Sequence, residues 1–177
     1  VENALIRHAL LAVLDKLDVE LRFNTPADAF DADLVIGADG ARSSVRESFG
    51  IDTRDFPYGQ TACVTHLQPE RPHRRAALQR FTRHGPLGIL PLADGRVSVV
   101  WSIDDELAAE VQAASDPQLG AMLTEASDHV LGALTVAGPR GAFPRCARHA
   151  RQYVLPGLAL VGDAAHAIHP LGGQGAN

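Results

Sequence analysis

The sequence predicts an α/β fold with α+β character in its central part, and three observations support this prediction. Two apolar runs, 34–36 and 158–161, each lead through a glycine to an aspartate, as expected where a buried strand ends. Residues 1–17 carry apolar side chains at helical spacing. Residues 51–145 alternate strand-like pieces with turns, which indicates a second, sheet-rich unit.

The composition excludes several classes of function. With 177 residues, 46% hydrophobic and 21% charged, the chain is ordinary globular material without an apolar run long enough to span a membrane. A formal net charge of −5 and the lack of a basic run argue against nucleic acid as a partner. Cys63 and Cys146 are far apart, which argues against zinc or a disulfide framework and favours a reducing cytosol. His166 and His169 have no third ligand nearby in sequence, so no metal site is predicted.

The chain opens with a predicted helix over residues 1–17. Its apolar residues place a stripe on one helical face; they are Leu5, Ile6, Leu10, Val13, Leu14 and Leu17. A strand over residues 19–23 follows, and Thr25-Pro26 breaks it before a buried strand over residues 33–36.

A first motif covers residues 32–46 and reads ADLVIGADGARSSVR. Asp39-Gly40 forms a tight turn after the strand, Ser43 or Ser44 caps a short helix, and Arg42 projects a positive charge beside the start of that helix. Because Asp-Gly is a common turn and Ser-Ser a common cap, a purely structural role is an alternative to ligand binding.

Residues 51–145 predict strands over 59–67, 76–82 and 97–102, with a hairpin turn at Asp94-Gly95. Two helices are expected over 104–114 and 117–134, capped by Asp104 and Asp116, and a turn-rich stretch over 138–146. Core packing is the simpler role for the apolar side chains that precede the hairpin, and contact with a substrate is the alternative; they are Leu87, Ile89, Leu90 and Leu92.

The last stretch, 158–177, carries the most specific pattern. Asp163 follows a predicted buried strand, at the end of the sheet where open α/β folds bind ligands. Ala164 and Ala165 leave room for a planar ligand, and Pro170 stiffens the turn. The three glycines of this loop allow backbone N–H groups to approach a ligand; they are Gly172, Gly173 and Gly175.

The run GDAAHAIHPLGGQGAN, residues 162–177, resembles the second FAD-binding motif of the flavin-dependent aromatic hydroxylases, the family of para-hydroxybenzoate hydroxylase. Within that family, the wording HPLGGQG and the stretch 80–102 are most similar to the ubiquinone-biosynthesis hydroxylases. The motif at 32–46 resembles the Asp-Gly motif that these proteins use for contacts with FAD and NADPH.

This resemblance implies that Asp163 holds a ribityl hydroxyl of FAD, that Pro170 lies against the flavin ring and that the amides of 171–176 face the flavin N1 and C2 carbonyl. For Asn3 and Arg7 a solvated helix face is an equal alternative. No catalytic base is identified. The implied FAD contacts are Asn3, Arg7, Asp39, Gly40, Arg42, Gly162, Asp163, Pro170, Leu171, Gly172, Gly173, Gln174, Gly175, Ala176 and Asn177.

The resemblance further implies an incomplete Rossmann-like FAD-binding domain in two parts, 1–55 and 146–177, around an inserted β-sheet substrate domain, 56–145. The expected activity is hydroxylation of a phenolic ring with NAD(P)H and O2, on a small aromatic or prenylated phenol such as a quinone precursor in ubiquinone biosynthesis. The expected location is the cytoplasm. Peripheral contact with the inner membrane, membership of a biosynthetic complex, the oligomeric state and the choice of NADH or NADPH stay open.

Two alternatives remain. One is another FAD enzyme of the superfamily, a halogenase or reductase, which would share the FAD fold, although Asp39-Gly40 and the stretch 80–102 favour the hydroxylases. The other is a non-catalytic folded fragment or interaction domain. The chain starts inside a helix pattern without methionine and contains no G-x-G-x-x-G turn for a pyrophosphate. We therefore expect it to be an internal fragment that does not turn over alone.

Overall fold

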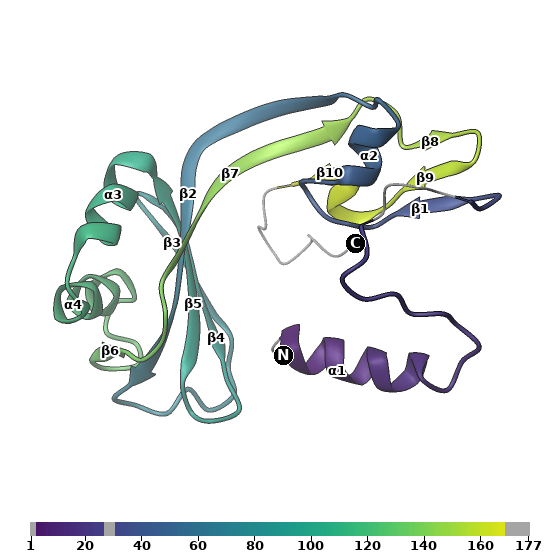
Figure 1. Cartoon of the computed structure of the whole chain (residues 1–177). Coiled ribbons are helices and arrows are strands. Elements are labelled where there is room, and N and C mark those ends of the chain that lie inside the picture. Colours follow the sequence, from purple (N-terminus) through teal and green to yellow (C-terminus); the bar gives the residue numbers. More distant parts are fainter. Residues whose placement is uncertain (1–2, 27–30, 169–177) are drawn as a thin grey trace.

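The structure is a computed structural model that describes residues 3–26 and 31–168, whose strands form two sheets (Figure 1). The smaller sheet has the strand order β1-β9-β8, and the larger one has seven strands in the order β10-β7-β2-β5-β4-β3, with β6 paired to β2. Helices accompany both sheets, so the predicted mixed α/β fold class is confirmed.

The larger sheet is antiparallel and carries the main hydrophobic core. Its strands are β2 (Thr53–Pro69), β3 (Leu78–Thr82), β4 (Gly85–Pro91), β5 (Val97–Asp104), β6 (Leu134–Val136), β7 (Gly141–Ala150) and β10 (His166–Ala167). Alternate residues of β5 point to the core, and Val97, Val99, Trp101 and Ile103 are buried there. The helices α3 (Asp105–Ala113) and α4 (Asp116–Ala126) cover this face, and Figure 1 shows them on one side of the sheet.

The caps of these helices only partly follow the prediction. Asp104 is the N-cap of α3, because its Oδ1 accepts a hydrogen bond of 2.9 Å from the backbone N–H of Leu107. Ser115, and not Asp116, is the N-cap of α4, and its backbone N–H donates to Oε1 of Gln118 at 2.8 Å. α4 ends at Ala126 instead of residue 134, since the chain then turns through two positive φ angles into β6, which was not predicted.

The smaller sheet consists of β1 (Val35–Gly37), β8 (Val154–Leu155) and β9 (Leu158–Leu160). β1 and β9 are parallel, and β8 and β9 are antiparallel. The short helix α2 (Ser44–Ser48) packs Val45 against Leu158 and Leu160 on one face. Gly37 permits this contact, because a Cβ atom there would lie 2.7 Å from Cδ2 of Leu160.

The apolar runs 34–36 and 158–161, which predicted buried strands, are only partly buried in the described chain. Ile36 is 59% exposed and Val161 is 45% exposed, because described residues cover only the face of the sheet that carries α2. A continuous apolar run does not distinguish one covered face from two.

The first helix, α1 (Asn3–Leu14), forms as predicted, but the apolar stripe that predicted it is exposed; for example, Leu5 and Leu10 are each 59% exposed. Helical spacing therefore indicated the local backbone conformation and not a contact surface within the described ranges. The strand predicted over residues 19–23 is absent, because no described strand pairs with that segment. No helix within 3–26 or 31–168 combines the length and apolar character that crossing a bilayer requires.

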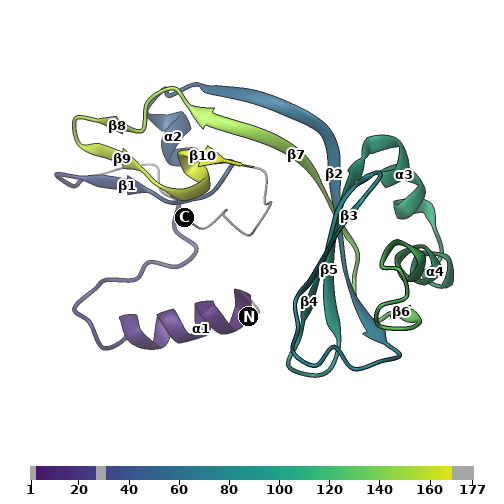
Figure 2. The same ribbon diagram turned by 180° about the vertical axis from the view of Figure 1, so that it is seen from behind.

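The long strands β2 and β7 run side by side and join the two parts of the fold (Figures 1 and 2). They pair from Thr53 and Ala150 to Val64 and Gly141, with a register shift between Pro57 and Gln60. The turn-rich stretch predicted over 138–146 is therefore mostly strand. Both strands extend across the predicted boundaries at 55/56 and 145/146, and the division into domains stays a prediction.

Candidate functional site

A cleft of about 360 Å³ brings the two sequence motifs together with the long strands. Its lining residues are Ala41, Tyr58, Pro144, Arg145, Cys146, Arg148, Asp163, Ala167 and Ile168. Ala41 follows the Asp-Gly turn and Asp163 follows β9. Tyr58 belongs to β2, and the lining residues between 144 and 148 belong to β7. The cleft is thus the described place where residues of both motifs meet.

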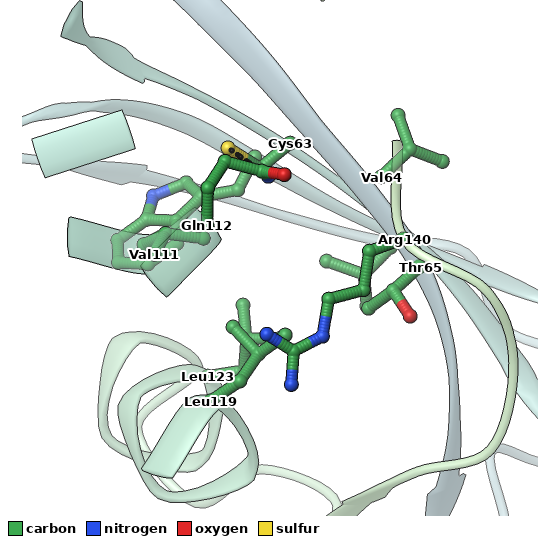
Figure 3. A pocket seen from close by; sticks show the side chains of 10 residues that line it. Cys63, Val64, Thr65, Val111, Gln112, Leu119, Leu123 and Arg140 are labelled. Atoms are coloured by element: carbon green, nitrogen blue, oxygen red, sulfur yellow. Dashed lines mark hydrogen bonds between the residues drawn. The ribbon is translucent and has the colours of Figure 1, made fainter. Parts of the chain in front are cut away.

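A second cavity, under α3 and α4, does not suit a ligand (Figure 3). Its volume of about 10 Å³ is close to the minimum for one water molecule. Figure 3 shows Gln112 beside Cys63, and Nε2 of Gln112 lies 3.7 Å from the sulfur. Burial raises the pKa of the Cys63 thiol, which disfavours the nucleophilic thiolate. We attribute this cavity to core packing.

The carboxylate of Asp39 organises the turn beside the cleft. It accepts hydrogen bonds from the hydroxyl of Ser43, from the hydroxyl of Ser44 at 3.2 Å and from the backbone N–H of Val45 at 3.1 Å. Partial burial acts to raise the pKa of Asp39, but these hydrogen bonds outweigh it and hold the pKa below its ordinary value. Ser43 is the N-cap of α2, since its Oγ accepts from the N–H of Arg46 at 2.9 Å. The described contacts of Asp39 are therefore structural.

Two arginines fix the loop after this turn. Arg46 is buried, and it donates to the carbonyl oxygens of Ala164 and Ala41, each at 3.1 Å. Arg148 donates to the same Ala41 oxygen at 3.0 Å and forms a bidentate pair with Asp55 at 2.9 and 2.5 Å. The Arg148 guanidinium lowers the pKa of Asp55, and Asp55 raises the pKa of Arg148. These contacts hold the two motifs and β7 in one arrangement.

Asp163 lies in the 3-10 turn Gly162–Ala164, directly after β9. Gly162 has a φ of 57°, a conformation that favours glycine, and it turns the chain so that Asp163 is exposed and lines the cleft. Within the described ranges, no side chain or backbone group donates a hydrogen bond to its carboxylate. The two alanines that follow, Ala164 and Ala165, are buried beneath the turn. The predicted place of Asp163 at the end of a strand is therefore observed, and its contact with FAD stays a prediction.

The remaining predicted contacts do not gather at the cleft. Arg7 is exposed on α1 and Arg42 is exposed beside α2, and neither lines the cleft, nor do Asp39 and Gly40. The side chain of Asn3 and the loop residues Pro170, Leu171, Gly172, Gly173, Gln174, Gly175, Ala176 and Asn177 lie outside the described residues.

Sequence reasoning missed the contribution of β2 and β7 to the cleft. Arg145 lies in the stretch 138–146, which was predicted to be turn-rich, and no site role was predicted for Tyr58 or Arg148. No local signal marked these residues, because their place in the cleft depends on the pairing of β2 with β7, which are far apart in the sequence. Among the residues that the structure describes, no group of three or more His, Cys, Asp or Glu side chains is placed to hold a metal ion.

The described residues fit a flavin cofactor. The carboxylate of Asp163 is able to accept a hydrogen bond from a ligand hydroxyl, because it lines the cleft without a donor among the described residues. The small residues Ala41 and Ala167 line the same cleft, and Arg145 supplies positive charge to it, whereas Arg148 is paired with Asp55. A carboxylate acceptor, a guanidinium and small side chains in one cleft suit a polyhydroxylated, negatively charged planar group.

Comparisons with known proteins agree with this geometry. A family model described as FAD binding domain matches residues 9–177. The chain is 39% identical over 195 residues to ubiquinone hydroxylase UbiL of Rhodospirillum rubrum, a match that covers 100% of this chain and 46% of the relative. It is 45% identical over 146 residues to 3-demethoxyubiquinol 3-hydroxylase of Escherichia coli, with 82% of this chain and 37% of the relative covered. The chain thus spans about half, or less, of these relatives.

Solved structures share the fold at lower identity. The flavin-dependent halogenase CmlS matches with a TM-score of 0.67 and 21% identity, over 81% of this chain and 28% of the halogenase. A ternary complex of aklavinone-11 hydroxylase with FAD and aklavinone matches with a TM-score of 0.60 and 21% identity, over 80% of this chain and 28% of that chain. The family matches confirm the resemblance stated from the sequence, whereas these structural matches show the fold alone.

Proposed function

The chain belongs to the FAD-binding domain family, and from this premise we propose that the protein is an FAD-dependent monooxygenase that hydroxylates a phenolic ring with NAD(P)H and O2. The observation that carries the proposal is the cleft in which Asp163 meets the loop of the Asp-Gly motif and the strand β7. Two relatives with hydroxylase names, from Rhodospirillum rubrum and Escherichia coli, support it.

The chain's own part in this reaction is to position its ligands. Asp163 would accept a ribityl hydroxyl, and the small side chain of Ala167 lines the cleft with it. Arg46 and Arg148 keep the Ala41 loop at the edge of the cleft. The bound FAD supplies the oxygen chemistry, so the protein must hold the ring of the substrate near it and exclude water.

We further propose that the substrate is a hydrophobic phenol, such as a prenylated quinone precursor. The face of the larger sheet that points away from α3 and α4 bears exposed apolar side chains, among them Phe81, Leu90 and Phe143. Leu87 and Ile89, by contrast, are buried in the core on the helix side, so of these apolar residues Leu90 is the better candidate for substrate contact. An exposed apolar surface of this kind suits a prenyl chain.

A substrate with a prenyl chain also favours peripheral contact with a membrane or with a biosynthetic complex. We propose a cytoplasmic enzyme that meets its substrate there without inserting a helix.

Stimulation of NAD(P)H oxidation tests the proposal. FAD should copurify with the full-length protein, and prenylated phenols should stimulate NADH or NADPH oxidation, with product formation followed by mass spectrometry. Protein that retains no FAD would contradict the cofactor assignment. Stimulation only by small charged phenols, such as hydroxybenzoates, would contradict the substrate class and leave the reaction type in place.

A further inference from the structure

Among the residues that the structure describes, Arg145 is a cation in the candidate cleft without a hydrogen-bond or ion-pair partner. It lies on β7 and lines the cleft, and its Nε is buried with no hydrogen-bond acceptor among the described residues. Burial lowers the pKa of its guanidinium. Because a partly desolvated charge is costly when it has no counter-charge, this site is suited to an anion that arrives with a ligand.

Arg148, on the same strand, differs from Arg145 because its guanidinium has a counter-charge among the described residues. Arg148 also lines the cleft, but Asp55 neutralises it through two hydrogen bonds of 2.9 and 2.5 Å. Arg46, next to the cleft, donates to two carbonyl oxygens. Arg145 is therefore the arginine of this group whose charge the described residues leave uncompensated.

The backbone opposite Arg145 is irregular in a way that shapes this wall of the cleft. Arg145 pairs with Gln60 and Cys146 pairs with Pro57, so β2 has extra residues at this point, one of which is Gly59 with a φ of 64°. Such a bulge changes the direction of neighbouring side chains. Here Tyr58, which belongs to the bulge, lines the cleft together with Arg145.

The cleft thus has two sides of different origin. Asp163, Ala167 and Ile168 come from the chain after β9, which carries the implied flavin motif. Tyr58, Pro144 and Arg145 come from the long strands of the larger sheet, which belong to the side proposed to receive the substrate. The uncompensated charge is on this second side.

We propose that Arg145 binds the ionised oxygen of the phenolic substrate and that the cleft thereby selects phenols in their phenolate form. The inference rests on the proposed function. When the phenol ionises, its O–H proton leaves to solvent and the oxygen keeps the electron pair, which the Arg145 guanidinium stabilises by charge and hydrogen bonding. A phenolate is more electron-rich than a phenol, which favours attack on the ring. Arg145 acts here on the substrate and not on FAD.

The test measures the pKa of a bound phenol and does not depend on turnover. 4-Fluorophenol is bound to the FAD-loaded full-length protein, and its fluorine NMR signal is followed as pH rises through its ionisation. The pKa of a free phenol is about 10. One opposite charge at close range lowers a pKa by about one to three units, so Arg145→Gln should raise the pKa of the bound phenol by that amount relative to wild type.

Two further variants make the result specific. Arg145→Lys keeps a point charge and should give an intermediate pKa. Arg151→Gln removes an exposed arginine that does not line the cleft and should titrate like wild type. FAD content and the circular dichroism spectrum check that each variant folds; if Arg145→Gln does not fold, Arg145→Lys alone must still raise the pKa.

Three outcomes overturn the inference. If Arg145→Gln folds and binds 4-fluorophenol with an unchanged pKa, Arg145 does not bind the phenolate, although the proposed function can stand. If Arg145→Gln loses FAD and leaves the phenol pKa unchanged, Arg145 is a cofactor contact instead. If the wild-type protein binds neither FAD nor 4-fluorophenol, the proposed function and this inference fall together.

Discussion

Replacing Arg46 with methionine is expected to loosen the joint between the two sequence motifs. The Arg46 side chain is only 4% exposed, and its two Nη groups each donate a hydrogen bond of 3.1 Å, one to the Ala164 carbonyl and one to the Ala41 carbonyl. Methionine retains most of the length of the alkyl stem and removes both donors, so the effect comes from lost hydrogen bonds more than from a cavity.

The magnitude follows from what each carbonyl retains. A hydrogen bond to a charged group contributes about 1.5 to 3 kcal/mol. The Ala41 oxygen keeps its bond of 3.0 Å from Arg148, whereas no other side chain in the described ranges donates to the Ala164 oxygen. The loss is therefore one full contribution and part of a second, or about 2 to 4 kcal/mol. The cost of burying the guanidinium disappears with it, which places the expected value at the lower end.

Urea unfolding of wild type and Arg46→Met measures this difference, with far-UV circular dichroism and the fluorescence of Trp101 as probes. With a slope near 2 kcal/mol per molar urea, the midpoint should fall by about 1 to 2 M. Arg42→Met, at an exposed position beside α2, is the matched control and should leave the midpoint unchanged. A midpoint of Arg46→Met within about 0.3 M of wild type would refute the reasoning, because the joint would then contribute almost nothing.

Three further predictions concern cofactor, pH and substrate. Asp163→Ala should weaken FAD binding to the full-length protein by about 1.5 to 3 kcal/mol, and an affinity measured by fluorescence quenching within twofold of wild type would exclude the ribityl contact. The pKa of Asp55 is lowered because Arg148 donates hydrogen bonds to it, so the pair stabilises the fold above the ordinary aspartate pKa of about 3.9 and this contribution is lost as pH falls through the lower folded value. Asp55→Asn should therefore flatten the acid side of the melting-temperature profile, and an unchanged acid slope would contradict it. Leu90→Asp, at a 48% exposed position, should raise the KM for a prenylated phenol roughly tenfold and spare a phenol without a prenyl chain, since it removes apolar contact; equal KM changes for both would count against contact with the prenyl chain.

Local signals in the sequence were sufficient for several elements. Asp94-Gly95 indicated the hairpin between β4 and β5, and Gly95 indeed has a φ of 92°. Asp104 indicated the start of α3, where it accepts the N-cap hydrogen bond. The position of Asp163 after a strand followed from the order of residue types alone. Each of these features depends on neighbours within a few residues, which is what a single sequence contains.

Features that depend on pairing between distant segments were not accessible in this way. Gly141 and Pro144 suggested turns, yet both lie in β7 because β2 supplies a long antiparallel partner. Residues 19–23 have a partly alternating pattern and form no strand, because the described chain offers them no partner. A period of two is a property of a paired strand, so the pattern predicts a strand only where a neighbour exists.

The candidate site combines residues of a local sequence motif with residues that are brought in by pairing between distant strands. The sequence could reveal only the part of its chemistry that the local motif carries. Asp163 belongs to a local motif, whereas Arg145 reaches the cleft through the register of β7 on β2 and Tyr58 through the bulge beside it. The bulge at Tyr58 and Gly59 interrupts that register opposite Arg145 and Cys146, and both of these residues line the cleft. The cofactor side is therefore encoded by a contiguous motif, and the proposed choice of an ionised phenol is encoded by strand pairing between residues that are far apart in the sequence.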